Sequence, residues 1–113
     1  MAMSKQDATW QPKPEDIPQL MDEADAGNVI SQYNLGVCYA KGNGVEVDLA
    51  EAVRWFRKAA EQGMPQAQHN LGLCLSRGVG VEKNVVEGAM WLNSAAQQGD
   101  AEAERMLNRW WGD

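Results

Sequence analysis

The sequence repeats itself with a period of 36 residues, and this period limits the fold more than any other feature. When residues 27–63 are aligned with residues 63–99, 16 of the 37 positions carry the same residue, which chance does not produce. Periods of this size are typical of solenoids, in which each unit buries its apolar face against its neighbours. The identical pairs include Gln32/Gln68, Asn34/Asn70, Leu35/Leu71, Gly36/Gly72, Cys38/Cys74, Trp55/Trp91 and Ala59/Ala95.

Each unit reads as two helices joined by a glycine-rich loop. Residues at helical spacing predict a first helix that stops at Gly42 in one unit and at Gly78 in the next. A Gly-x-Gly-Val loop follows, in which glycine can take a positive φ. Asp48 and Asn84 are the expected N-caps of the second helix, each with a glutamate three residues later, as in a capping box. The second helix then carries an apolar stripe: Ala52/Gly88, Trp55/Trp91, Phe56/Leu92 and Ala59/Ala95.

Partial units extend the pattern at both ends. By the same shift Leu20 matches Phe56, which predicts a leading helix of the second type that tolerates Pro18 in its first turn. Asp100 is the expected N-cap of a terminal helix. We expect five helices, antiparallel and stacked, with no strand. The predicted organisation is a flexible tail at 1–13 and a single domain at 14–113, with the leading helix at 17–26, repeats at 27–62 and 63–98, and the terminal helix at 100–111.

The repeated motif resembles the Sel-one-like repeat, a branch of the tetratricopeptide-like solenoids. The first unit matches it at Gln32, Leu35, Gly36, Tyr39, Gly42, Gly44, Val45, Asp48, Ala52, Trp55, Ala59, Ala60 and Gly63. The second unit departs from it at Leu75, Asn84 and Gly88. The resemblance implies an all-α protein, a short right-handed α/α superhelical solenoid of antiparallel helix pairs. It also implies a non-catalytic adaptor that binds a partner protein or peptide in a concave groove.

Composition and charge exclude several classes of function. A net charge of −6 argues against a surface devoted to nucleic-acid phosphates, and no apolar run is long enough to span a bilayer. No nucleophile stands with a base, and the glycines follow the structural period. We expect no enzyme activity, no cofactor, and no nucleic-acid or membrane partner. The first 13 residues lack an apolar export signal, so we expect a cytoplasmic protein, with a signal removed earlier as the alternative.

Several conspicuous residues are expected to serve the structure. Trp55 and Trp91 occupy equivalent positions and are predicted core residues. Cys38 and Cys74 are predicted to be small buried hydrophobes on neighbouring helices, about 8–10 Å apart and too distant for a disulfide. His69 has no companion at metal-ligand spacing, so no metal site is expected. Gly36 and Gly72 lie in mid-helix, where we expect a close approach of the paired helix; Asn108 replaces them in the last unit.

The candidate binding site follows from the tetratricopeptide-like resemblance, which places one face of each first helix in the groove. The cations at these positions favour an acidic partner segment, with Tyr33 and Leu73 supplying apolar contact. The alternative is a solvated polar face whose asparagines bond between helices. The groove residues are Tyr33, Asn34, Val37 and Lys41 in the first unit, His69, Asn70, Leu73 and Arg77 in the second, and Arg105, Met106 and Arg109 in the third.

Self-association is the second functional hypothesis. Trp110 and Trp111 end the last helix at the positions of Cys74 and Leu75, where no further helix follows to cover them. A two-fold homodimer through this end would bury both tryptophans. The alternative is that Trp110 folds back on the tail or on Trp10.

Overall fold

The computed structural model of the chain describes residues 11–111, and these form six α-helices and one short 3-10 helix, with no strand. The expectation of five helices was wrong, because the leading helix, two pairs and the terminal helix make six. No helix in this part of the chain is long and apolar enough to cross a bilayer. The elements are η1 (Pro14–Asp16), α1 (Ile17–Asp25), α2 (Val29–Lys41), α3 (Leu49–Glu61), α4 (Pro65–Arg77), α5 (Val85–Gln97) and α6 (Ala101–Trp111).

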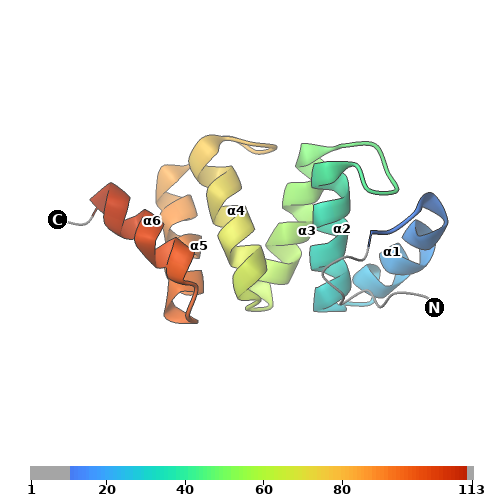
Figure 1. Cartoon of the computed structure of the whole chain (residues 1–113), viewed down its shortest axis with the longest axis horizontal. Helices are drawn as coiled ribbons and strands as arrows, with labels where there is room; N and C mark the ends of the chain where they lie inside the picture. The colour runs from blue at the N-terminus through green and yellow to red at the C-terminus, as the bar shows by residue number, and fades with distance from the viewer. Residues whose placement is uncertain (1–10, 112–113) are drawn as a thin grey trace.

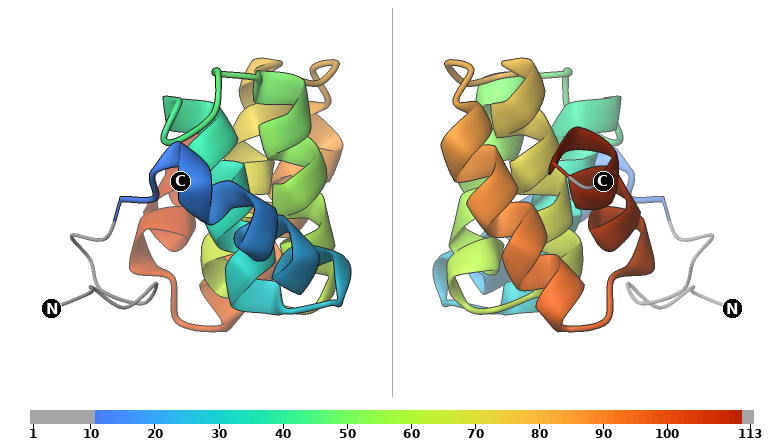
Figure 2. Two further views of the ribbon diagram at one scale, coloured as in Figure 1. Left: turned by 90° about the vertical axis from the view of Figure 1, so that its right-hand side faces the viewer. Right: turned by 90° about the vertical axis from the view of Figure 1, so that its left-hand side faces the viewer.

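The helices stack side by side in chain order along the long axis of the molecule (Figure 1). Each of them packs mainly against the next one in the sequence. Seen along the stack, α3 and α5 lie on one side, whereas α2 and α6 lie on the other (Figure 2). The all-α solenoid of antiparallel helix pairs is therefore confirmed, and the division into a tail at 1–13 and one domain stays a prediction.

The helix ends follow the predicted capping residues, with one difference. Gly42 ends α2 in the left-handed region, at φ 78°. The Asp48 side chain accepts a hydrogen bond from the Glu51 N–H, at 3.1 Å, and so caps α3. The reciprocal half of the predicted capping box is wrong, because the Asp48 N–H donates to the Tyr39 carbonyl instead, at 2.9 Å. The second unit repeats both bonds with Asn84, Glu87 and Leu75.

The expected core residues are buried to different degrees. Trp55 is 5% exposed and lies in a cluster with residues of α1 and α2. Trp91 is only half-buried, so the prediction of a core position is confirmed fully for Trp55 and in part for Trp91. Cys38 is likewise buried and Cys74 half-buried, and both thiols are free. Burial raises the pKa of Cys38 to about 11 and also raises that of Cys74, so both stay protonated near neutral pH.

The two mid-helix glycines mark the predicted close approach of paired helices. A Cβ on Gly36 would stand 2.6 Å from the Phe56 ring, and a Cβ on Gly72 would stand 2.7 Å from Leu92 Cγ. Both distances are shorter than real Cβ contacts allow. Glycine at these positions therefore lets the second helix of each unit lie directly against the first.

Two buried glutamines connect the helices of successive units. Gln32 of α2 donates to the carbonyl of Ala24, at the end of α1, at 3.1 Å. Its amide oxygen accepts from Gln62 at the end of α3, at 2.8 Å, and Gln62 also donates to the Gly27 carbonyl. We call this arrangement the amide clasp. The second unit repeats it with Gln68, Ala60, Gln98 and Gly63.

The two units fill the contact between their paired helices with different pairs of small side chains. The first unit has Ala40 and Ala52 at positions where the second has Ser76 and Gly88. A Cβ on Gly88 would collide with the Ser76 hydroxyl, so the serine oxygen takes the room of the missing methyl group. Ser76 is buried, and its hydroxyl has no hydrogen-bond partner among the described residues.

This exchange predicts a compensating pair of substitutions. Gly88→Ala gains up to about 1 kcal/mol of helix propensity but overpacks the contact at a cost of about 1–3 kcal/mol, so we expect a net loss of stability. Adding Ser76→Ala recreates the alanine pair of the first unit and should recover the part of that loss caused by the hydroxyl, while the Gly72 carbonyl, 2.8 Å from the new Cβ, still has to shift. Urea unfolding of both variants, with Ser76→Ala alone as the control, measures the coupling. Equal stability of the Gly88→Ala variant and the double variant would contradict this account of the contact.

Candidate functional site

One face of α2 and α4 carries repeated positions with exposed or half-buried polar side chains. In α2 the positions 30, 34 and 41 follow helical spacing and lie on one side of the helix. Lys41 and Arg77 are exposed, whereas Asn34 and Asn70 are half-buried. We define the first-helix face by Ile30, Asn34 and Lys41 of α2 and by Gln66, Asn70 and Arg77 of α4.

Sequence reasoning missed two residues of this face. Ile30 is 37% exposed although it is large and apolar, and Gln66 is exposed at the equivalent position of α4. Both lie one turn before the asparagine of their helix, so continuing the i, i+4 spacing backwards would have found them. Ile30 gives the first-helix face an apolar contact beside its polar groups.

Four predicted groove residues are half-buried and pack within the stack. The Tyr33 ring lies 5.8 Å from the Phe56 ring, measured between centroids. Val37 and Leu73 each pack against an apolar cluster formed by the second helix of their own unit and the first helix of the next. His69 Nδ1 lies 2.8 Å from a carboxylate oxygen of Asp100, the residue that caps α6. These side chains pack within the stack rather than projecting freely from the face, and the contact of His69 with Asp100 joins α4 to the start of α6.

Asp100 both caps α6 and contacts His69 of α4. One carboxylate oxygen accepts from the Ala103 N–H at 3.0 Å, which confirms the predicted cap, and the other faces His69. Burial raises the pKa of this carboxyl, but the hydrogen bonds from Ala103 and His69 outweigh it and leave the pKa below its ordinary value. The ionised form of Asp100 therefore ties α4 to the start of α6.

The predicted cations of α6 stand at different register positions from Lys41 and Arg77. Arg105 takes the place of Tyr33 and His69, and Arg109 takes that of Val37 and Leu73. In the earlier units these places pack toward the next unit, so on α6 both arginines, which are exposed, occupy its outward side. Met106 replaces the asparagines and is buried at 6% exposure.

The C-terminal end of α6 is mixed in character. Trp110 is 39% exposed and makes an interaction of its own, and Asn108 near it is exposed. The Trp111 side chain and Trp10 lie outside the described residues, so the predicted contacts of both stay untested. The part of the chain that the structure describes contains no group of three histidine, cysteine or acidic side chains placed to hold a metal ion.

A polar network joins the second helices of the two units. The Arg57 guanidinium of α3 donates to a carboxylate oxygen of Glu87 on α5 at 2.8 Å, and the Trp91 indole N–H donates to the same oxygen at 3.2 Å. Hydrogen bonds from Arg57 and Trp91 lower the pKa of Glu87, against the effect of burial. In the first unit Glu51 bonds Arg54 of its own helix instead, and the Trp55 indole N–H is buried without a partner among the described residues.

The Glu87 network predicts a pH-dependent contribution to stability. Because the folded pKa of Glu87 is lowered, its stabilisation is present above the ordinary glutamate pKa and is lost as pH falls through the folded pKa. The stability difference between wild type and Glu87→Gln should be largest near pH 7 and shrink as pH falls below the ordinary glutamate pKa, with solvent screening limiting it to about 1 kcal/mol. Urea unfolding across this range measures it.

Glu51→Gln is the matched control for this experiment, because it removes the equivalent carboxylate from the first unit. Its exposed partner Arg54 lies on the same helix, so we expect a smaller difference at pH 7. A Glu87→Gln difference that stays constant down to pH 3, or that is no larger than the Glu51→Gln difference, would contradict the assignment.

Comparison with known proteins places the repeat. The family model described as Sel1 repeat matches residues 29–64 and 65–100, each about one period long. The chain belongs to the Sel1 repeat family. The resemblance that the motif indicated is therefore confirmed, and proteins of this family are generally protein-interaction modules.

Solved structures share the fold. A Sel1 repeat protein from Oxalobacter formigenes superposes with a TM-score of 0.78 at 40% identity, over 85% of this chain and 40% of that one. A protective antigen of uropathogenic Escherichia coli strains that displays an SLR fold gives 0.81 at 35% identity, over 85% and 21%. Helicobacter pylori cysteine rich protein B gives 0.77 at 24% identity, over 82% and 70%, which shows the fold alone.

The match to a curated relative covers only a short stretch of both proteins. The DAP3-binding cell death enhancer 1 of Rattus norvegicus is 45% identical over 40 residues, which is 35% of this chain and 8% of that protein. The chain thus spans under a tenth of this relative and less than half of the first two solved structures. These matches concern the repeat, and the partner of this chain is a separate question.

Proposed function

We propose that this Sel1 repeat protein is a non-catalytic adaptor that holds an acidic segment of a partner protein on the first-helix face. The observation that carries the proposal is the pair Lys41 and Arg77, which are exposed at the same register position of neighbouring first helices. Neither makes an ion pair with any residue between 11 and 111. In a chain of net charge −6, two such cations on one face are available to an external carboxylate.

The surroundings of these cations suit an extended peptide. The half-buried Asn70 carries an amide that can donate to and accept from a peptide backbone. Exposed Ile30 offers an apolar contact on the same helix face. An extended chain advances about 3.3 Å per residue, so a segment of about six to eight residues reaches about 20–26 Å and is long enough to contact both helices.

A purely structural explanation exists for the cations and has to be tested. Lys41 and Arg77 stand in the last turns of α2 and α4, where positive charge interacts favourably with the helix dipole. That effect stabilises the helices without any partner. It predicts that the cations matter for folding only, whereas the adaptor proposal predicts that they also matter for capture of an acidic segment.

The test is calorimetric titration with an acetylated and amidated ten-residue peptide of alternating aspartate and serine. We expect salt-sensitive binding to the wild-type protein that the double charge reversal Lys41→Glu and Arg77→Glu weakens roughly tenfold or more. The control is Arg54→Glu with Lys58→Glu on α3, which changes the net charge equally and should leave this affinity within about twofold. No binding to the wild-type protein, or equal weakening by both double variants, would overturn the proposal.

Self-association is less well supported by the arrangement of α6. Trp110 is partly exposed, but Arg105, Asn108 and Arg109 on the same helix are exposed and polar. Desolvating two arginines at a homodimer interface is costly unless both find partners. The adaptor on the first-helix face is therefore the function we favour.

A further inference from the structure

A second candidate surface lies on α3, in the layer that faces away from α2 and α6. An open pocket of about 500 Å³ runs along the exposed side of this helix and is closed at one end by the loop that precedes α5. A volume of this size suits a few side chains of a bound peptide. The lining residues are Ala50, Val53, Arg54, Arg57, Lys58, Glu61, Gly80 and Val81.

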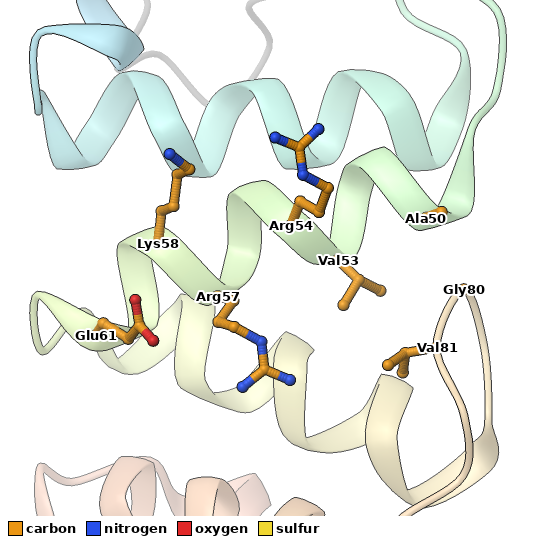
Figure 3. Close-up of a pocket in the computed structure, with 8 residues that line it drawn as sticks. All are labelled: Ala50, Val53, Arg54, Arg57, Lys58, Glu61, Gly80 and Val81. Atoms are coloured by element: carbon orange, nitrogen blue, oxygen red, sulfur yellow. The ribbon is translucent and has the colours of Figure 1, made fainter.

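The pocket combines an apolar end with cations on its edges (Figure 3). Val53 of α3 and Val81 of the loop lie near each other at the apolar end, whereas Arg54 and Lys58 project to one side of α3 and Arg57 to the other. Three cations and one carboxylate line the space. The loop approaches closely here, because a Cβ on Gly80 would collide with the carbonyl of Leu49, so only glycine brings Val81 against α3.

The cations keep donors that their present contacts do not use. Arg54 pairs with Glu51 on an exposed part of the same helix, and Arg57 donates through one Nη1 atom to Glu87. Each guanidinium has five N–H donors, so several stay available to a ligand. The Lys58 ammonium lies 5.3 Å from the centre of the Trp55 ring and makes no ion pair among the described residues.

Comparison of the repeat units shows that the fold does not require these charges. The second unit carries Met90, Asn93 and Ser94 at the positions of Arg54, Arg57 and Lys58. The leading helix has Pro18, Met21 and Asp22 there. All three second-type helices form, and only α3 places cations along this side. The charge of the pocket is therefore a property of this unit and not of the scaffold.

We propose that the α3 pocket binds an acidic peptide segment that carries an apolar side chain between its carboxylates. The apolar side chain would lie against the exposed Ala50 and the half-buried Val81, above the buried Val53. The flanking carboxylates would accept hydrogen bonds from Arg54 and Lys58 on one side and Arg57 on the other. This site is separate from the first-helix face. With both occupied, the protein bridges two acidic partners from opposite layers of the stack.

The test uses an acetylated and amidated five-residue peptide with leucine between two pairs of aspartates, titrated into the ¹⁵N-labelled chain. We expect the backbone amide signals of Val53, Gly80 and Val81 to shift in a saturable way. Replacing leucine by serine in the peptide should remove most of the shift, because the apolar contact is lost. Inorganic phosphate at equal charge is the second probe, and it should produce no saturable shift at these amides.

Two double variants separate this site from the first-helix face. Arg54→Glu with Lys58→Glu should weaken the leucine peptide about tenfold or more, because two carboxylate partners become repulsive. Lys41→Glu with Arg77→Glu carries the same net charge and should bind it as the wild type does. Retained amide dispersion and cooperative thermal unfolding establish that both variants fold. We expect a modest loss of melting temperature in each, because Lys41 and Arg77 interact with the helix dipoles and Arg54 pairs with Glu51.

Three results would overturn the proposal. The first is the absence of saturable shifts at Val53, Gly80 and Val81, and the second is equal weakening by both double variants. The third is phosphate binding as tight as that of the leucine peptide, which would make the pocket a general anion site. None of these results depends on the first-helix face, whose own test uses a peptide without apolar side chains.

Discussion

The amide clasp of Gln32 and Gln68 fixes how each unit meets the next. Each of these glutamines bonds the end of the preceding second helix and accepts from a glutamine at the end of the following one. Both side chains are buried, so an unpaired amide would cost about 1–3 kcal/mol and a slipped register would be penalised. The clasp therefore holds three consecutive helices in one register and repeats 36 residues later.

This register decides which side chains of each helix reach the surface. Within each first helix, one side packs on its partner helix through glycine, and a second side packs toward the next unit, as Val37 and His69 do. The positions left over recur one period apart and give the first-helix face. On the other layer, Arg57 and Glu87 connect α3 to α5.

Much of the fold could be predicted from the sequence because its signals are local. Glycines ended helices, Asp48 and Asn84 capped them, and Gly36 and Gly72 marked close approaches, since each residue type has one strong physical reason to be there. Identity between units also aligned Gln62 with Gln98. It gave no indication that these glutamines complete the clasp, because that bond joins helices 30 residues apart.

The candidate site was harder to predict because its surroundings depend on contacts between helices that are distant in sequence. Tyr33 and His69 share a helix side with the groove positions, and only the folded chain shows that Tyr33 packs on Phe56 of its own unit and that His69 contacts Asp100 of the next. Arg105 and Arg109 matched the pattern in sequence, but α6 places them at positions that face outward from the stack. Ile30 was overlooked because an isolated apolar residue near a helix start resembles a core residue. The pairing of Arg57 with Glu87 depends on which helices become neighbours.

An amide chemical-shift map of the ¹⁵N-labelled chain with the aspartate–serine peptide tests most directly whether the first-helix face holds the partner. We expect the shifts to follow residues 30–41 and 66–77 together and to saturate at a single affinity, because one peptide crosses both helices. Shifts confined to α3 and α5, or to the end of α6, would contradict the claim that the first-helix face holds the partner.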